Sequence, residues 1–246
     1  MRPLSPLLSR LRMIPKVASI AYRSLRTSAY ARQGKYLKYD LAFENALASR
    51  DPRRGLTVTY DENYTLFSSV KAIRDIDGAI AEVGVYKGNT AKLICEVKGE
   101  RPLFLFDTFE GMPNEKISEF DEWELNTHTD NTPESVQAYL SKYPNVTLIA
   151  GRFPESLAKP SGQIAISQTY AMVNIDVDLY QSTLDALEFF YPRLSSGGRL
   201  ISHNYNLKDS PGGNTPGVNK AFAEFFKGKT SQIVEIAETQ CLVVKP

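Results

Sequence analysis

The stretch AIAEVGVYKGNTAKLIC, residues 79–95, changes character halfway along. It begins with a short apolar run typical of a buried strand, continues through a turn that contains glycine, and ends with the apolar spacing of a helix. A strand followed by a turn and a helix is the start of a βαβ unit, since parallel strands need a crossover between them. The stretch therefore predicts an α/β fold.

The same alternation continues to the C-terminus. The predicted parallel strands are AIAEVGV (79–85), PLFLFD (102–107), VTLIAG (146–151), YAMVNIDV (170–177) and GRLISH (198–203). SQIVEIAE (231–238) and TQCLVVKP (239–246) add two more, close enough for a hairpin that brings in one antiparallel strand. We expect a doubly wound, mostly parallel seven-stranded sheet of Rossmann-like type, covered by helices on both faces and preceded by an N-terminal helical extension.

Three parts are predicted along the chain. Residues 1–35 are a basic amphipathic segment, residues 36–76 a helical preface, and residues 77–246 the α/β domain. Nine of the 29 Lys and Arg residues precede the first acid, Asp40. An oligomer-forming or other structural helix, a membrane-surface helix and a removable targeting peptide all share this basic pattern, and these alternatives stay open.

Composition narrows the function classes. The body after Asp40 is mildly acidic, so a nucleic-acid partner is not expected. No apolar run approaches the ~20 residues that a membrane span needs. Cys95 and Cys241 form no C-x-x-C pair, which fits a reducing compartment. We expect a cytoplasmic protein, with peripheral membrane contact or a homo-oligomer as roles for its N-terminal segment.

Ligands of open α/β sheets bind outside the carboxyl ends of the strands. Gly84 and Gly88 flank the turn after the first strand, where glycines let a ligand approach the backbone, and Thr90 caps the helix or donates to the ligand. Their G-x-x-x-G spacing differs from the G-x-G-x-x-G that holds a pyrophosphate. The spacing favours a nucleotide without a diphosphate and argues against a nicotinamide-dependent oxidoreductase.

Acids mark the ends of further strands. Asp107 ends the second strand, about 25 residues after Glu82, where a carboxylate holds a ribose diol. Together these two acids suggest an adenosine moiety, with S-adenosylmethionine the natural candidate; the alternative is that they only cap loops. Asp176 and Asp178 end the fourth strand, opposite His203 in the fifth, where oxygen ligands suit a divalent cation.

Five motifs in order resemble the macrocin O-methyltransferase family: AEVGVYKGNTAKL, LFDTFEGMP, GRFPESL, NIDVDLYQSTLDALEFFYPRLSSGGRLI and PGVNKAFAEFF. The resemblance implies a class I S-adenosylmethionine-dependent fold, magnesium, and methyl transfer to a hydroxyl of a small acceptor, commonly a natural-product sugar. It implies that Asp176 is a metal ligand beside the transferred methyl. The cofactor-binding residues that it implies are Glu82, Gly84, Tyr86, Gly88 and Thr90 for the methionine part, Asp107 and Thr108 for the ribose, and Arg152 and Phe153 for the adenine.

The chain departs from the family after the fifth strand, where the family has two successive acids followed by a tyrosine: His203 and Asn204 replace the two acids, and Tyr205 keeps the tyrosine. Three interpretations follow. Asp176, His203 and Asn204 hold a softer metal, because imidazole suits manganese, iron or zinc better than magnesium. Alternatively, the site is metal-free and His203 is the general base beside Asp176. In the third interpretation the protein binds the cofactor without catalysis.

Two polar segments flank the predicted site. His128 and Trp123 lie in the first, where His128 is either a solvated loop residue or part of a substrate cover, and where Trp123 would stack on an acceptor. NLKDSPGGNTPG, residues 206–217, is either a second cover or a plain link between strand and helix.

Overall fold

The computed structural model describes residues 40–55, 58–112, 118–121, 127–205, 216–237 and 239–246. The chain divides into two compact units, Met1–Ala48 and Ser49–Pro246, which we describe separately. In the first, helix α3 (Leu41–Ala48) begins after Asp40, whose carboxylate accepts hydrogen bonds from the backbone N–H groups of Ala42 and Phe43. The basic segment of residues 1–35, together with Trp123 and most of the second polar segment, lies outside the described residues, so the expectations about them stay predictions.

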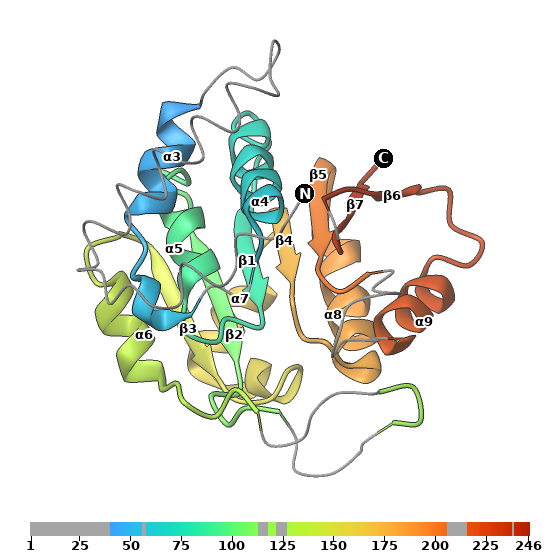
Figure 1. Ribbon diagram of the computed structural model, residues 1–246. Coiled ribbons are helices and arrows are strands. Elements are labelled where there is room, and N and C mark those ends of the chain that lie inside the picture. Colours follow the sequence, from blue (N-terminus) through green and yellow to red (C-terminus); the bar gives the residue numbers. More distant parts are fainter. Residues whose placement is uncertain (1–39, 56–57, 113–117, 122–126, 206–215, 238) are drawn as a thin grey trace, which may run out of the picture. The chain divides into compact units, whose positions relative to one another are not determined.

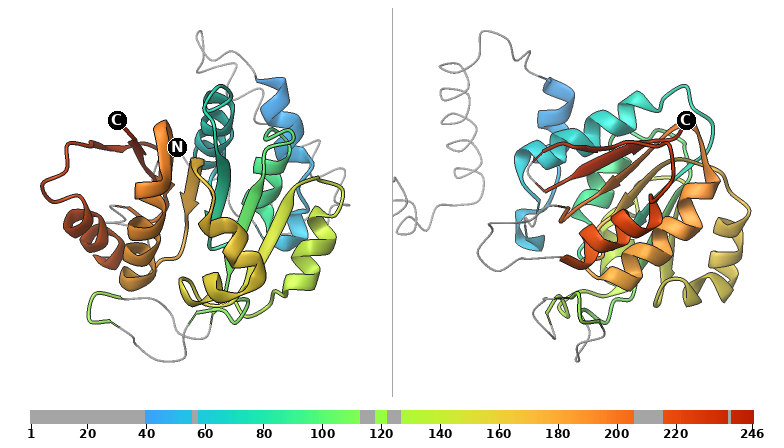
Figure 2. Two further views of the ribbon diagram at one scale, coloured as in Figure 1. Left: turned by 180° about the vertical axis from the view of Figure 1, so that it is seen from behind. Right: turned by 90° about the vertical axis from the view of Figure 1, so that its right-hand side faces the viewer.

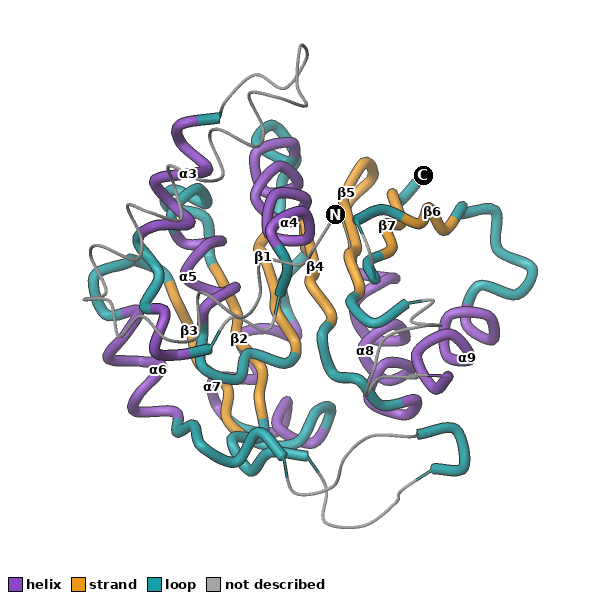
Figure 3. The backbone as a smooth tube through the Cα atoms, in the orientation of Figure 1, coloured by secondary structure: helices purple, strands orange, loops and turns teal. Residues whose placement is uncertain are grey.

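The second unit is built on a seven-stranded sheet in the order β3-β2-β1-β4-β5-β7-β6, as Figures 1 and 3 show. Strands β1 to β5 run parallel, and β7 pairs antiparallel with both β5 and β6. The mostly parallel sheet with its closing hairpin is therefore confirmed. The strands are β1 (Ala79–Val83), β2 (Leu103–Asp107), β3 (Val146–Ala150), β4 (Tyr170–Ile175), β5 (Leu194–Ser202), β6 (Ile233–Glu235) and β7 (Cys241–Val244).

Helices cover both faces of this sheet. Figure 2 shows α4 and α5 on one face and α8 and α9 on the other, and the members of each pair contact each other. The described helices of this unit are η1 (Pro52–Arg54), α4 (Tyr60–Ala72), α5 (Asn89–Cys95), α6 (Pro133–Leu140), η2 (Glu155–Ala158), α7 (Pro160–Ile166), α8 (Tyr180–Arg193) and α9 (Pro216–Phe225). No helix in the described parts of the chain is both long and apolar enough to cross a membrane.

Two helices on the side of α8 show what the sequence pattern alone does not. Helix α7 was not predicted, because its sequence PSGQIAI is short and includes serine and glycine. Helix α8 begins at Tyr180, where the Asp121 carboxylate accepts from the Tyr180 N–H and stabilises the first turn of the helix.

The two central strands are buried along their whole length, as expected for strands covered on both faces. Aromatic side chains, including the stacked Phe153 and Phe190, pack beneath the carboxyl ends of the strands. Within this apolar surrounding, Glu82 of β1 accepts a hydrogen bond of 2.9 Å from Asn174 of β4. Both side chains are fully buried, and burial raises the pKa of Glu82 to about 8.

Candidate active site

A cavity of about 680 Å³ opens at the carboxyl ends of the five parallel strands. Each strand contributes a lining residue from its last position or the next: Gly84, Asp107, Gly151, Asp176 and His203. The strand order reverses between β1 and β4, and ligands of open α/β sheets bind at such a switch point. The size is within the ~300–1,000 Å³ of small-molecule sites.

Most of the predicted site residues line this one cavity. They are Gly84, Tyr86, Thr90, Asp107, Thr108, Arg152, Phe153, Asp176, His203 and Asn204. Glu82 and Gly88 do not line it: Glu82 lies beneath it in the sheet, and a Cβ on Gly88 would meet the Val136 side chain at 3.1 Å. The space at Gly88 therefore serves helix packing rather than the approach of a ligand.

Gly84 lets the turn after β1 pack directly against the backbone that follows β4. Its φ is +88°, and an added Cβ would lie 1.9 Å from the carbonyl oxygen of Asp176. The Asp176 N–H in turn donates to the carbonyl of Val83 at 2.8 Å. Only glycine permits this approach of two backbones, so Gly84 determines where Asp176 stands.

Asp107 organises the turn after β1. Its Oδ2 accepts from the backbone N–H groups of Val85 and Tyr86, both at 2.7 Å, and its Oδ1 accepts from the N–H of Phe109 at 2.7 Å. A carboxylate has about four acceptor positions. Three are used here, so Oδ1 retains capacity for one further donor from a ligand.

The loop that holds His128 closes one side of the cavity. His128 has a φ of +59° and packs edge-on against the Tyr86 ring at 4.7 Å, so it lines the cavity instead of standing free in a solvated loop. Asn131 donates to the Tyr86 carbonyl at 3.0 Å, while its own amide oxygen is buried without a partner among the described residues. Asn131 is a cavity-lining residue which the sequence analysis missed, because nothing in a polar loop marks one asparagine over its neighbours.

The side of the cavity beyond Asp107 is lined by Thr108, Arg152 and Phe153. The Thr108 hydroxyl accepts from the Glu110 N–H at 3.1 Å. Arg152 is largely exposed at the rim and lies 4.0 Å from the Glu155 carboxylate. Phe153 is 6% exposed, so most of its ring belongs to the aromatic core. An apolar ring edge between polar groups suits a flat heteroaromatic ligand.

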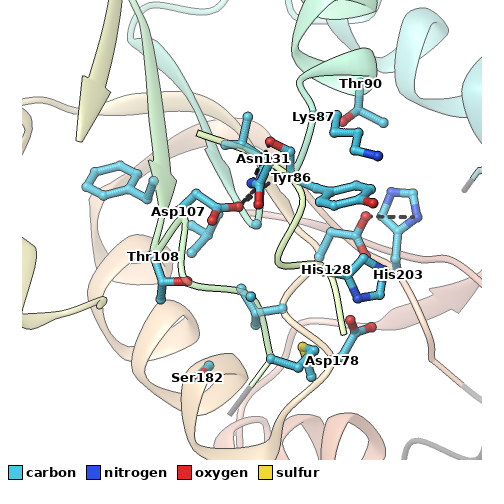
Figure 4. Close-up of a pocket in the computed structure, with 18 of the residues that line it drawn as sticks. Tyr86, Lys87, Thr90, Asp107, Thr108, His128, Asn131, Asp178, Ser182 and His203 are labelled. Carbon is cyan, nitrogen blue, oxygen red and sulfur yellow. Dashed lines mark hydrogen bonds and ion pairs between the residues drawn. The ribbon is translucent and has the colours of Figure 1, made fainter. Parts of the chain in front are cut away.

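On the opposite side, shown at the right of Figure 4, lie Asp178 and the two histidines. Strand β4 ends at Ile175, and Asp178 adopts a φ of +61°, so it does not continue the strand beside Asp176. Asn204 also has a positive φ, of +58°, and its amide donates to Asp178. Such left-handed conformations of residues other than glycine occur more often at functional sites than elsewhere.

The carboxyl groups of Asp176 and Asp178 are poorly solvated. Burial raises the pKa of Asp176, while the nearby imidazole of His203 works to lower it. Burial also raises the pKa of Asp178 well above its ordinary value, and the neighbouring Asp176 adds to this. Carboxyl groups with raised pKa values suit proton transfer from a weakly acidic hydroxyl.

His203 is 4% exposed and lies between two partners. Its Nδ1 is 4.0 Å from Asp176 Oδ2, and its Nε2 is 3.0 Å from Gln240 Nε2. Gln240 also donates to the carbonyl of Glu62 in α4. Neither Gln240 nor Glu62 was identified from the sequence, since each becomes a neighbour of His203 only through the pairing of β7 with β5 and the packing of α4.

Magnesium does not fit these donors. His203 offers nitrogen where carboxylate oxygen is needed, its Nε2 already faces an N–H of Gln240, and the Asn204 amide is directed at Asp178. In the part of the chain that the structure describes, no group of three or more His, Cys, Asp and Glu side chains is arranged to hold a metal ion.

Arginines were also missed. Arg50 and Arg54 line the cavity from a segment that the sequence analysis assigned only to the helical preface. Arg54 lies over the Tyr139 ring at 4.3 Å and donates to the carbonyl of Lys87, which fixes its guanidinium beside the turn after β1. Burial lowers the pKa of Arg50. These side chains place positive charge at the Gly84 end of the cavity.

Comparison with known proteins adds to this geometry. The chain is 32% identical over 148 residues to the 8-demethyl-8-(2,3-dimethoxy-alpha-L-rhamnosyl)-tetracenomycin-C 4'-O-methyltransferase of Streptomyces olivaceus, a match that spans 54% of this chain and 54% of that enzyme. It is 30% identical over 187 residues to the mycinamicin III 3''-O-methyltransferase of Micromonospora griseorubida, which covers 67% of this chain and 68% of that enzyme. The chain thus spans about half the length of the first of these relatives and about two thirds of the second.

Among solved structures, the O-methyltransferase NovP superimposes with a TM-score of 0.67 over 92% of this chain and 99% of its own, at 20% identity. This similarity shows the class I, Rossmann-like methyltransferase fold. The macrocin O-methyltransferase (TylF) family model matches residues 20–230. The chain therefore belongs to the macrocin O-methyltransferase family.

Proposed function

We propose that this protein transfers the methyl group of S-adenosylmethionine to a hydroxyl of a small acceptor, a sugar or another natural-product moiety. The observation that carries the proposal is the cavity at the ends of five parallel strands in a member of this family, with Asp107 at the tip of β2. One relative is named as an O-methyltransferase of a rhamnosyl-tetracenomycin and another as an O-methyltransferase of mycinamicin III, which favours a sugar or other natural-product acceptor here.

The cofactor fits the polar groups that the cavity presents. The open acceptor position of Asp107 suits a ribose hydroxyl. Thr108, Arg152 and Phe153 would border the adenine, and the turn from Gly84 to Thr90 the methionine part. When bound, S-adenosylmethionine supplies a methyl group on a sulfonium, which leaves as a neutral thioether once the methyl carbon is bonded to oxygen.

The protein's own task is to align the acceptor and accept its proton. Asp176 and His203 are the candidates, since both line the cavity 4.0 Å apart at the ends of neighbouring strands. As the new oxygen–carbon bond forms, the hydroxyl O–H bond breaks and the proton passes to this pair. Because the donors do not fit magnesium, no step of the proposal uses a metal.

Methyl transfer from ¹³C-methyl-labelled S-adenosylmethionine tests the proposal. The full chain is incubated with glycosides that carry free sugar hydroxyls, including rhamnosyl natural products, and the labelled methyl is located by NMR. A new O-methyl signal that depends on the protein supports the proposal. Label on nitrogen or carbon alone, or a failure of the protein to bind S-adenosylmethionine in calorimetry, contradicts it.

One observation favours a second candidate, a non-catalytic cofactor-binding protein: His203 and Asn204 stand where the resemblance implies two acids. Tight binding of S-adenosylmethionine, with no transfer to any acceptor in a panel that the tetracenomycin and mycinamicin enzymes methylate, would support this candidate instead.

A further inference from the structure

The pairing of β5 with β7 places a glutamine directly behind His203. Ser202 is opposite Cys241 in the antiparallel register, so the next pair along is His203 and Gln240. Gln240 is 1% exposed and belongs to the turn between β6 and β7, where its N–H donates to the carbonyl of Ala237. The side chain therefore comes from a rigid, buried position.

The surroundings of Gln240 determine which way its amide points. Its Nε2 lies 3.3 Å from the backbone carbonyl oxygen of Glu62 and 3.0 Å from His203 Nε2. A carbonyl oxygen only accepts hydrogen bonds, so the amide atom that faces it must be the nitrogen; the reverse orientation would set oxygen against oxygen. The second N–H of the amide then points at His203 Nε2.

The backbone carbonyl of Glu62, which accepts from Gln240, is held in a fixed position. Glu62 is the N3 residue of α4 and forms a capping box with Thr59. The Glu62 carboxylate accepts from the Thr239 hydroxyl at 2.6 Å, next to Gln240 in the chain. Burial works to raise the pKa of Glu62, but the bonds from Thr239 and Thr59 hold it below the ordinary value. Helix α4 and the β6–β7 turn are thus locked together behind the imidazole.

We propose that Gln240 is a positioning residue that donates to Nε2 of His203 and so keeps the proton of the neutral imidazole on Nδ1, facing Asp176. The ring nitrogen that carries the proton is set by the hydrogen bond at the other nitrogen. In this tautomer His203 presents a donor to the cavity, and the proton acceptor for the reaction is the Asp176 carboxylate, 4.0 Å from Nδ1. This assignment of roles rests on the proposed function, whereas the tautomer itself does not.

The tautomer can be measured directly, because the chain has only two histidines. Long-range ¹H–¹⁵N correlation spectra of the ¹⁵N-labelled full chain distinguish Nδ1–H from Nε2–H, and His128→Gln assigns the two rings. We expect Nδ1–H for His203 in the wild type and its loss in Gln240→Glu, whose carboxylate accepts from Nε2–H. A wild-type ring protonated at Nε2 overturns the proposal without any need for a variant.

Measurements of kcat and of cofactor affinity show whether Gln240 positions His203 or only supports the structure. Gln240→Met keeps the volume but removes the donor, so kcat should fall about tenfold while the dissociation constant of S-adenosylmethionine stays within about twofold. Gln232→Met, the same change at an exposed position just before β6, should leave both unchanged. Equal kcat in Gln240→Met and wild type would overturn the role of Gln240. If instead the Nδ1–H tautomer is found but the wild type transfers no methyl group, the proposed function fails and the tautomer assignment stands.

Discussion

The two sides of the cavity are built differently. On the side of Asp107, the contacts are mostly made by the backbone: three backbone N–H groups donate hydrogen bonds to the single carboxylate of Asp107. On the side of Asp176, a backbone carbonyl of α4 meets side chains from the ends of β4 and β5 and from the β6–β7 turn, and their roles depend on one another. The side of Asp107, the proposed cofactor half, is thus built locally from two consecutive strands, whereas the side of Asp176, the proposed acceptor half, is assembled from distant segments.

The largest effect is expected at the acceptor half. Asp176→Asn keeps the shape but removes the proton acceptor, so kcat should fall by about 10²–10⁴, the usual contribution of a general base. Binding of S-adenosylmethionine should change by less than about threefold. Initial rates with an acceptor found in the transfer screen, together with calorimetry, measure both quantities. A kcat within a few-fold of wild type would show that Asp176 is not the base.

Gly84→Ala tests the junction between the two halves. Its Cβ would collide with the backbone of Asp176, so we expect a loss of at least about 3 kcal/mol in the free energy of unfolding from urea titration. Gly99→Ala is the matched control, because Gly99 also has a positive φ, +59°, but open space around its Cβ. It should cost about 1 kcal/mol. Equal losses in the two variants would mean that φ alone matters at Gly84.

Glu82→Gln tests the buried acid beneath the cofactor half. The pKa of Glu82 is raised in the folded protein from 4.5 to about 8, so the wild type loses stability as the pH rises between these values. We expect a loss on the order of 2–4 kcal/mol between pH 5 and pH 9 that Glu82→Gln lacks. Urea unfolding at both pH values measures it, with the exposed Glu188→Gln as control. An identical pH slope in Glu82→Gln and wild type would contradict the burial of a neutral acid.

The smallest expected effect is that of metal removal. Because the donors around His203 do not fit magnesium, activity after dialysis against EDTA should equal activity with added magnesium within about twofold. Activity that is lost and then restored by manganese or zinc would instead support the softer-metal interpretation of Asp176, His203 and Asn204.

The local side of the cavity could be predicted from the sequence better than the side that is assembled from distant segments. Gly84 and Asp107 stand at the ends of strands that the apolar pattern marks clearly, so the sheet and these lining residues could be predicted. The close approach of the Asp176 backbone to Gly84 could not be predicted, because sequence spacing does not show which atoms pack against a glycine. Gln240 and Glu62 are some 178 positions apart in the chain, and only the strand register and the packing of α4 bring them to His203.

The most direct test of the cofactor half is calorimetric titration of S-adenosylmethionine into the full chain and into Asp107→Ala. Asp107 holds the turn after β1 and has one acceptor position open to the ribose, so the variant should bind about 100-fold more weakly. The matched control is Asp130→Ala, which removes an exposed acid that contacts the same turn through Tyr86 and Lys87. The control should bind like wild type. Equal affinity of Asp107→Ala and wild type, with both proteins folded, would contradict the assignment of the cavity to this cofactor.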